Sequence, residues 1–444
     1  MPKESDTISQ ASRIPRPDHS ISRSNISSGA LKVLYTLKKA GFEAYLVGGG
    51  VRDLLLGREP KDFDCVTDAE PEEIKRLFRS ARLIGRRFRL AHVRFGPEII
   101  EVATFRGPAD DSGEGADGDN RVSVNGRIVR DNVYGTTVED DVWRRDFSVN
   151  CLYYDIRDFS VLDITGGLAD LEAGVLRIIG DPVHRYREDP VRMLRAVRFA
   201  AKLGFRLGEE TGAAIPECAP LLAEIPPARL YEEVLKMFLG GAAVQSFELL
   251  HHYDLFKYLF AESAERMEAE PLSPGTKLVL QALANTDQRI QEDKPVTPAF
   301  LFAALLWPAV EADAAAHRDR GLTAVQAMDA AGMDVLERQI SQVSVPRRFS
   351  LASREIWSLQ SRLEQRRGKR AVQLLGRPRF RAAYDFLLLR AEAGEEVAEM
   401  ADWWTKFQEM DDAGQKAALA GASTGTGTRR RRRRRRRRQP QAQT

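Results

Sequence analysis

Two aspartates separated by a single residue, Asp62 and Asp64, form a pattern that could take part in catalysis. They lie in Lys61-Asp62-Phe63-Asp64, which we interpret as a strand. Alternate side chains of a strand project from one face, so Phe63 is expected to pack behind the two carboxylates. Neighbouring carboxylates repel each other unless cations lie between them, and Mg²⁺ prefers a few carboxylates together with substrate phosphates. The pattern favours a metal-dependent reaction at a phosphate.

Three glycines, Gly48-Gly49-Gly50, come shortly before this pair. They follow an apolar run and precede an amphipathic segment, so Tyr45–Thr67 predicts a strand, a glycine turn, a helix and a second strand. Glycine turns let backbone N–H groups approach a phosphate. A glycine triplet or an Asp-x-Asp alone is common in turns and surface loops. The two together at this spacing predict nucleotidyl transfer.

The same stretch resembles the signature of one branch of the nucleotidyltransferase superfamily. That branch contains the bacterial poly(A) polymerases and the bacterial and eukaryotic CCA-adding enzymes. Its signature, G-G-x-V-R-D-x-L-L-G followed by D-x-D, is intact here as Gly48, Gly49, Val51, Arg52, Asp53, Leu55, Leu56, Gly57, Asp62 and Asp64. The resemblance implies that Asp62 and Asp64 are catalytic metal ligands. It also implies that Gly48, Gly49 and Arg52 bind the nucleotide.

A third carboxylate, Glu101, lies in the candidate strand Ile99–Phe105. A charge in such an apolar run is costly to bury unless it is paired or metal-bound, although a solvated Glu at an edge gives the same pattern. Related enzymes place their third catalytic carboxylate in a matching E-V-x-T-F strand. The resemblance therefore implies a catalytic and metal-binding role for Glu101. Glu98, in the preceding turn, is the alternative.

An arginine-rich element follows at Val142–Asn150. Paired arginines engage phosphates through their planar forks, and Asp or Asn bonds ribose hydroxyls, but a salt-bridged helix start has a similar sequence. The element resembles the family's R-R-D-F-[ST]-x-N motif, matched by Arg144, Arg145, Asp146, Phe147, Ser148 and Asn150. The resemblance implies that Arg144, Arg145, Asp146 and Asn150 contact the triphosphate and the sugar.

A capped helix is predicted after Asp189, because Asp is a good N-cap and Pro190 fits the first helical position. Arginines then recur every third residue, which also suits a solvated basic stripe. Adenine offers an amino donor and ring-nitrogen acceptors, which a carboxylate and a guanidinium can bind. In the family an E-D-x-x-R-x-x-R helix supplies this pair. The resemblance implies that Asp189 and Arg192 read the base and that Glu188 and Arg195 support them.

The composition is that of a globular protein of two or three domains, with 444 residues, 43% hydrophobic and 30% charged. No run of about 18 apolar residues occurs, which predicts no membrane span. The cysteines Cys65, Cys151 and Cys218 are scattered. They suit small buried side chains in a reducing cytoplasm better than a disulfide framework or a zinc site.

The charge is unevenly distributed along the chain. Ten consecutive arginines, Arg429–Arg438, contribute +10, and removing them from the net +3 leaves −7 on the remainder. Such a block does not fold and favours an interaction arm for a nucleic-acid backbone, although a merely solubilising segment has the same composition. A second basic group suits an RNA backbone or a solvated helix face: Arg366, Arg367, Lys369, Arg370, Arg377, Arg379 and Arg381.

The periodicity of apolar residues, together with the resemblance, predicts an α+β head followed by helical domains. Helical spacing covers Ser28–Gly41, and strands are expected at Leu90–Phe95 and Ile99–Phe105 around a Gly-Pro turn. The acidic stretch Gly107–Asn132 is expected to be a flexible surface loop. The expected domains are a disordered lead-in (1–27), a nucleotidyltransferase head with a mixed or antiparallel sheet (28–175), a helical neck (176–265), a helical body (266–412), and a disordered linker with the arginine tail (413–444).

Stretches outside the shared signature resemble bacterial poly(A) polymerases more than CCA-adding enzymes. They are Leu83–Val93, Phe95–Gly107, Tyr186–Arg195, Ile225–Leu230, Pro298–Ala304 and Phe380–Asp385. The resemblance implies a cytoplasmic, monomeric enzyme that adds AMP from ATP to RNA 3′ ends without a template, using two Mg²⁺ ions. Polyadenylation of this kind would promote RNA processing or decay. A CCA-adding tRNA nucleotidyltransferase is the alternative, because the head motifs are common to both.

Overall fold

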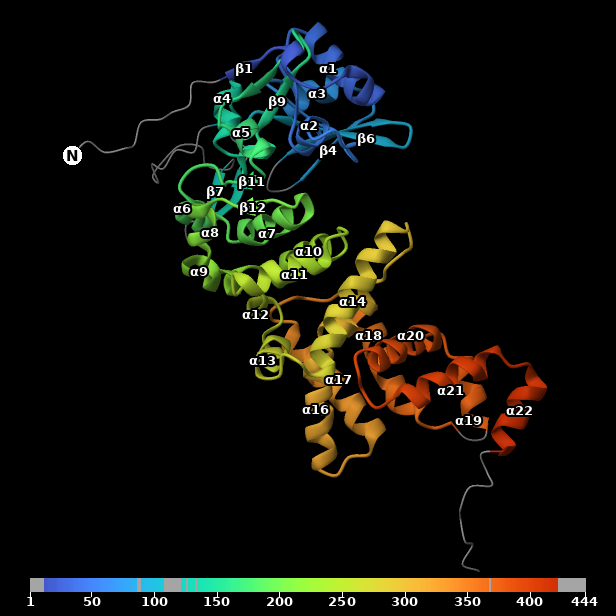
Figure 1. The fold of residues 1–444 in the computed structure, drawn as a ribbon. Helices are drawn as coiled ribbons and strands as arrows, with labels where there is room; N and C mark the ends of the chain where they lie inside the picture. The colour runs from blue at the N-terminus through green and yellow to red at the C-terminus, as the bar shows by residue number, and fades with distance from the viewer. Residues whose placement is uncertain are drawn as a thin grey trace, which may run out of the picture.

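The computed structural model describes residues 12–85, 89–107, 121–124, 127–131, 134–366 and 369–421. A head built on a β-sheet, a helical neck and a helical body follow one another along the chain (Figure 1). One hydrophobic core runs from Leu46 in the sheet through the neck to Trp357 in the body. A second core surrounds Trp404 near the end of the body. The fold class is therefore α+β, as the sequence predicts.

The head sheet has eight strands in the order β1-β10-β9-β2-β3-β6-β5-β4. Their bounds are β1 Ser12–Ile14, β2 Ala44–Val47, β3 Asp64–Thr67, β4 Ala81–Ile84, β5 Leu90–Phe95, β6 Glu98–Thr104, β9 Leu152–Asp155 and β10 Val161–Asp163. The pair β3 and β6 is parallel, and the other neighbouring pairs are antiparallel. The predicted strands at residues 90–95 and 99–105, and the turn between them, are confirmed within a residue.

Two helices, α1 (Ser28–Lys39) and α3 (Pro71–Leu77), pack against one face of this sheet (Figure 1). Successive strand residues point to opposite faces, so Leu46 and Val102 pack towards these helices. Tyr45 and Val66 pack into a separate core on the other face. The short helix α2 (Gly49–Leu55) connects β2 to β3. The sheet therefore positions the glycine turn after β2, Asp64 in β3 and Glu101 in β6.

The remaining head elements are short. They are α4 Val138–Val142, the 3₁₀ helix η3 Ser148–Asn150, α5 Gly167–Glu172 and β11 Val175–Leu176, which pairs in parallel with β12 Arg206–Leu207 of the neck. The neck contains α6 Pro182–Glu188, α7 Val191–Leu203, α8 Glu209–Ala213, α9 Ile215–Cys218, the 3₁₀ helix η4 Ala219–Glu224, α10 Pro227–Phe238, α11 Ala243–His252, α12 Phe256–Leu259 and α13 Ala261–Ala269.

The body is all helical, as predicted. Its helices are α14 Pro274–Gln291, α15 Pro298–Leu305, α16 Trp307–Asp319, α17 Ala324–Gln339, α18 Arg347–Leu363, α19 Lys369–Leu375, α20 Phe380–Glu392, α21 Ala398–Glu409 and α22 Asp412–Gly421. In the described ranges, no single helix is long and apolar enough to cross a membrane. The pair α15 and α16, bent by 58°, passes such a test together by length and composition.

The expected disordered lead-in is wrong for residues 12–27. Strand β1 pairs with β10, where Ser12 is opposite Asp163, and two 3₁₀ helices follow, η1 (Arg16–Asp18) and η2 (Arg23–Asn25). Ile21 and Ile26 are buried in the main core. Pairing with β1 covers a row of backbone groups that β10 would otherwise expose at the sheet edge.

The expected flexible loop at 107–132 and the linker from 413 each contain regular structure. Strands β7 (Arg121–Val124) and β8 (Arg127–Asp131) form an antiparallel pair, and both contain β-branched residues, which favour strands. Residues 108–120 lie outside the described residues. Helix α22 continues to Gly421, since its sequence is rich in alanine. The arginine run at 429–438 lies outside the described residues.

Candidate active site

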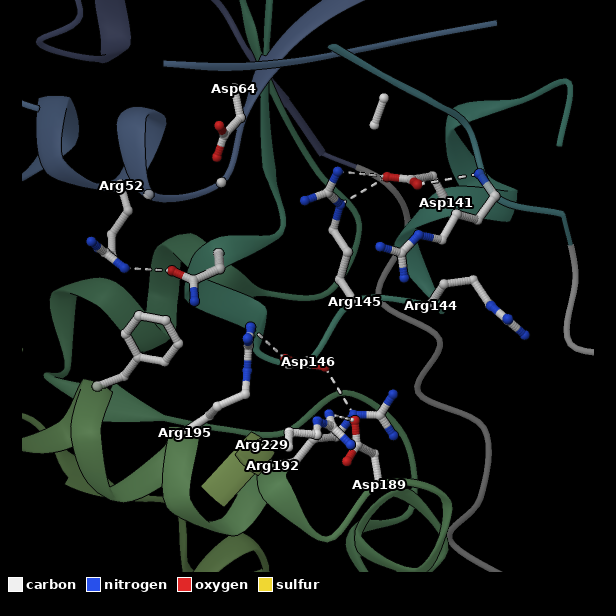
Figure 2. Close-up of a pocket in the computed structure, with 16 residues that line it drawn as sticks. Arg52, Asp64, Asp141, Arg144, Arg145, Asp146, Asp189, Arg192, Arg195 and Arg229 are labelled. Atoms are coloured by element: carbon white, nitrogen blue, oxygen red, sulfur yellow. Dashed lines mark hydrogen bonds and ion pairs between the residues drawn. The ribbon is translucent and has the colours of Figure 1, made fainter. Parts of the chain in front are cut away.

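A cleft of about 510 Å³ lies between the head and the neck (Figure 2). Its lining includes seven arginines and four aspartates: Arg52, Arg106, Arg144, Arg145, Arg192, Arg195 and Arg229, with Asp64, Asp141, Asp146 and Asp189. The excess of arginines gives the walls a positive charge, which attracts anions such as polyphosphates.

The glycine turn forms one wall of this cleft. Gly48 has φ 75° and ψ −143°, a combination that glycine adopts and residues with a β-carbon avoid. A β-carbon on Gly48 would lie 3.6 Å from Asp64 Oδ2, so the turn passes directly beside that carboxylate. Gly49 also lines the cleft, as does Arg52 in α2. The predicted strand, glycine turn and helix are therefore confirmed.

Asp64 is the first residue of β3 and lies directly opposite Glu101 of the parallel strand β6. Both side chains therefore project from the face opposite α1. Burial, together with the charges of Glu101 and Asp62, raises the pKa of Asp64 to about 6. The three predicted carboxylates are thus close enough to influence one another.

Asp62 precedes β3 instead of lying within it, which corrects the predicted strand. Strand β2, which pairs with β3, ends at Val47 opposite Asp64, because the chain turns away at Gly48. Asp62 therefore has no partner residue in β2. Asp62 is exposed, whereas Phe63 is buried as expected. Asp64 is thus the first residue of the strand, and Asp62 lies two residues before it, outside the strand.

Glu101, whose side chain is 49% exposed, bonds His92 of β5, with 3.1 Å between Oε1 and Nε2. Asp64 lines the cleft, whereas Glu101 and Asp62 do not. In the part of the chain that the structure describes, no three or more His, Cys, Asp or Glu side chains gather tightly enough to hold a metal ion. The donors are all oxygens, and burial together with the neighbouring carboxylates raises the pKa of Asp64, a combination that suits a hard cation such as Mg²⁺.

The alternative carboxylate, Glu98, lies on the other face of the sheet. A β-carbon added to Gly29 of α1 would clash with the Glu98 carboxylate, so this side chain is packed against α1. Glu98 and Glu101 differ by three positions in one strand, and an odd spacing puts them on opposite faces. Only Glu101 shares a face with Asp64.

Arg145 is fixed in the cleft by two neighbours. Its Nε donates to Asp141 Oδ2 and to the Tyr153 hydroxyl, both at 2.8 Å, and Asp141 is only 2% exposed. Burial would lower the pKa of Arg145, but Asp141 raises it above its ordinary value. The guanidinium is therefore charged, and it lies between Asp141 and Asp64 in Figure 2.

Arg52 is held in a similar way. Its Nη1 donates to Asn150 Oδ1 at 2.6 Å, and its Nε and Nη2 donate to Asp53 Oδ1 at 2.9 and 2.7 Å. Arg52 is 3% exposed. Asn150, predicted to contact the sugar, thus lines the cleft while it orients Arg52. Arg144 is also buried and lines the cleft.

Asp146 of the head is tied to the first turns of α7. Arg192 Nε lies 2.8 Å from Asp146 Oδ1, and Arg195 Nη2 lies 2.7 Å from Oδ2. Burial would raise the pKa of Asp146, but the two guanidiniums hold it below its usual range. Glu188 accepts from Nη1 of Arg192 and of Arg185, each at 2.6 Å. Glu188 supports Arg192 without lining the cleft.

Asp189 has a structural role and a position in the cleft. Its Oδ1 accepts the N–H of Val191 at 3.3 Å, but helix α7 begins at Val191 with Pro190 in the N-cap position, one residue later than predicted. Its Oδ2 accepts from Arg229 Nη2 of α10 at 2.6 Å. One carboxylate oxygen is therefore fixed by the start of α7 and the other by an arginine of a different helix. Asp189 is 8% exposed.

Most of the predicted nucleotide-binding residues meet in this cleft: Gly48, Gly49, Arg52, Arg144, Arg145, Asp146, Asn150, Asp189, Arg192 and Arg195. The sequence reasoning missed Arg106, Asp141, Phe199 and Arg229. Arg106 follows the strand that contains Glu101, and Arg229 lies in Ile225–Leu230, which resembles bacterial poly(A) polymerases. Their positions within these stretches could have identified both residues from the sequence. Asp141 carried no signal, because an acidic helix start is common on surfaces.

The chain matches three protein families along its length. These are the Poly A polymerase head domain over residues 44–177, the probable RNA and SrmB-binding site of polymerase A over 204–267, and the polymerase A arginine-rich C-terminus over 320–439. These matches agree with the observed division into head, neck and body.

Curated relatives give the same result over most of the chain. Poly(A) polymerase I of Escherichia coli O157:H7 is 51% identical over 416 residues, which cover 92% of this chain and 88% of the relative. Poly(A) polymerase I of Haemophilus influenzae is 46% identical over 391 residues, with coverages of 87% and 86%. A CCA-adding enzyme of Lactobacillus helveticus is 40% identical over 220 residues, half of this chain and 52% of the relative.

Solved structures support the fold. A tRNA-processing enzyme aligns with a TM-score of 0.59 at 23% identity, covering 91% of this chain and 98% of the other. A tRNA nucleotidyltransferase complexed with a primer tRNA and an incoming ATP analog aligns with a TM-score of 0.54 at 23% identity, covering 87% and 99%. At such identity the likeness extends to the fold alone. On the identity and coverage of its curated relatives, this chain belongs to the family of bacterial poly(A) polymerases.

Proposed function

We propose that this cleft is the ATP site of a template-independent polynucleotide adenylyltransferase, which adds AMP to RNA 3′ ends in the cytoplasm. The enzyme class follows from the family to which the chain belongs. The assignment of the site rests on one observation: Asp64, several arginines, and the predicted base-binding residues Asp189 and Arg192 all line the same cleft. These groups suit a metal-bound triphosphate and an adenine edge.

Asp62, Asp64 and Glu101 would hold Mg²⁺, which when bound neutralises phosphate oxygens and lowers the pKa of the attacking hydroxyl. In the transfer, the 3′-hydroxyl oxygen of the RNA bonds to the α-phosphorus of ATP. The bond from that phosphorus to the bridging oxygen breaks in line, pyrophosphate leaves, and the hydroxyl proton passes to solvent.

The arginines supply fixed positive charge for this step. Arg52 and Arg145 bind triphosphate oxygens, because both side chains line the cleft and both are held in place by neighbouring residues. Asn150 holds Arg52 and Asp141 holds Arg145 before substrate arrives. Charges held in place in this way stabilise the leaving pyrophosphate without a reorganisation cost.

Selection of the base rests on Asp189 and Arg192. Asp189 accepts the adenine amino hydrogen, and Arg192 donates to a ring nitrogen. Glu188 and Asp146 fix the Arg192 guanidinium, and Arg229 fixes the Asp189 carboxylate. Cytosine presents the same amino donor beside a ring-nitrogen acceptor, whereas uracil and guanine present the reverse pattern, so this rigid pair favours ATP over UTP and GTP.

The direct test is to incubate the protein with a short single-stranded RNA, Mg²⁺ and each nucleotide separately, and to read product lengths. We expect a ladder with ATP and little extension with CTP. The Asp64→Asn variant should lose extension, and the matched Asp402→Ala variant should keep it, because Asp402 is exposed on α21 far along the chain. Addition of CTP to transfer RNA lacking its 3′ end, followed by arrest, would instead identify a CCA-adding enzyme.

A further inference from the structure

A second hollow, of about 530 Å³, lies on the head away from the ATP cleft. Its lining is basic and partly apolar: Arg79, Arg82, His92 and Arg94, with Ile84 and Ile99. It is formed by the strands β4, β5 and β6, of which β4 is the edge of the sheet. These six residues are called the basic sheet face below.

The basic sheet face is on the side of the sheet opposite α1 and α3. Ala91 and Val93 of β5 are buried in the core beneath those helices, so the alternating residues His92 and Arg94 point the other way. Asp64 and Glu101 project from this same side. The ATP cleft and the second hollow therefore belong to one face of one sheet.

The strand register joins them in a single row. Asp64 lies opposite Glu101, Glu101 opposite His92, and His92 opposite Arg82. Neighbouring strands are about 4.8 Å apart, so this row extends roughly 14 Å from the cleft to the sheet edge. Stacked nucleotides advance by about 3.4 Å each, so the row spans roughly four nucleotides.

The three arginines of this face lack acidic partners among the described residues, whereas His92 is bonded to Glu101. Arg79, Arg82 and Arg94 are exposed, and no acidic residue lines the hollow. Within the described ranges none of these three guanidiniums has an ion pair, in contrast to Arg89, which pairs with Glu72. Ile84 and Ile99 are 39% and 37% exposed, which leaves apolar surface between the arginines.

We infer that the basic sheet face binds the single-stranded RNA just upstream of its 3′ end. The inference rests on the proposed function, since an RNA whose 3′-hydroxyl reaches Asp64 must run along some surface from there. Arg82 and Arg94 bind phosphates, and the two isoleucines contact bases or sugars between them. His92 joins this face to the active site through its bond to Glu101.

The test is the double variant Arg82→Ala/Arg94→Ala. We expect the KM for a short oligoadenylate to rise at least tenfold and the KM for ATP to stay within twofold. The slope of log Kd for RNA against log salt concentration should fall by about 1.4, because each lost phosphate contact removes about 0.7 on single strands. The matched control is Lys38→Ala/Lys39→Ala, which removes two exposed charges from α1 on the opposite face.

An unchanged RNA KM and salt slope in the arginine variant would overturn the inference, and so would an equal loss in the lysine control. A wild-type protein that does not extend RNA with ATP would instead refute the proposed function. An RNA carrying 4-thiouridine near its 3′ end gives an independent measurement. We expect photocrosslinks to the peptide His92–Ile99, and crosslinks confined to the neck or body would contradict the assignment.

Discussion

At the scale of single residues, the chemistry of the head depends on the environment of Asp64. Its pKa of about 6 results from burial and from two neighbouring carboxylates, Glu101 and Asp62. Arg145 works in the opposite direction and keeps the repulsion partly balanced. A cation brought by the nucleotide would complete that balance, which is why the site is suited to a metal–triphosphate complex.

The outer carboxylates are expected to be necessary for turnover and unimportant for folding. Asp62→Ala and Glu101→Ala should each lower kcat by at least about 100-fold while leaving RNA binding largely intact, because both side chains are partly or fully exposed. Glu98→Ala is the matched control, since Glu98 occupies the same strand on the opposite face. Single-turnover AMP addition and RNA affinity should be measured together. Near-normal transfer by Glu101→Ala would exclude it as a metal ligand.

Asp189 is expected to determine which base is accepted. Asp189→Asn keeps the shape of the side chain but removes the charge that fixes Arg229 and accepts the adenine amino group. The ratio of kcat/KM for ATP to that for UTP should fall about tenfold, equivalent to about 1.4 kcal/mol, because the amide can donate to the uracil carbonyl and the carboxylate cannot. Glu217→Gln, which breaks the exposed pair with Arg187, is the control and should leave the ratio unchanged. An unaltered ratio in Asp189→Asn would contradict its role in base selection.

At the scale of elements, the turn between β2 and α2 places the phosphate-binding groups. Gly48 is needed for its backbone conformation, whereas Gly57 has φ 69° at the end of α2 with nothing near its missing β-carbon. Both alanine substitutions introduce backbone strain of about 1–3 kcal/mol. Gly48→Ala should also abolish activity, because the strained turn adjoins Asp64.

Thermal unfolding and AMP addition distinguish these two effects. Both variants should have a lower Tm than the wild type, and Gly57→Ala should keep most of its activity at a temperature where it is folded. Equal activity losses in the two variants would indicate that general destabilisation, rather than the turn beside Asp64, explains the effect.

Helix α16 carries a carboxyl that links stability to pH. Burial and the charge of Glu395 raise the pKa of Glu311 from 4.5 to about 7. Between these values the folded protein retains a proton that the unfolded chain releases, so the free energy of unfolding falls as the pH rises through this window. Glu311→Gln stays neutral, and at pH 8 it should be more stable than wild type by up to about 3 kcal/mol, with little difference below pH 4.5.

Denaturant unfolding at several pH values measures this linkage. Glu337→Gln on the neighbouring helix α17 is the control, because Glu337 is exposed and should leave the pH dependence unchanged. A pH profile identical in wild type and Glu311→Gln would show that the raised pKa does not contribute to stability.

At the scale of the whole molecule, one core joins the catalytic head to the helical domains. Buried residues of this core run from α1 through α7 and α10 to α18. The ion pairs of Asp146 with Arg192 and Arg195 cross the same boundary between head and neck. The ATP cleft is built from both sides, so its shape depends on how the head and neck are packed together.

The arginine tail is expected to act on RNA affinity and not on chemistry. Deleting residues 429–444 removes ten positive charges and should weaken RNA binding and lower its salt slope by several units. Addition of a single AMP to a short primer at saturating concentration should remain, because residues of the head and neck line the cleft. Binding titrations at several salt concentrations measure this effect. A lost single addition would place the tail in the catalytic step.

Local elements of the head could be read from the sequence because they depend on nearby residues. Gly48 requires a turn that only glycine adopts, and alternation in Leu90–Phe95 and Glu98–Thr104 defines the two strands and their faces. Residues 12–27 were misassigned because a three-residue strand has too little pattern of its own. It forms only because β10 offers an edge to pair with.

The motifs, their order along the chain and the class of chemistry that they serve follow from the amino-acid sequence alone. Three features are visible only in the folded protein: Glu101 and not Glu98 shares a face with Asp64, Asp141 holds Arg145, and Arg229 holds Asp189. Asp189 and Arg229 are 40 residues apart, in different helices. Backbone geometry and periodicity act over a few residues, whereas such contacts arise only when the packing of head, neck and body brings distant segments together.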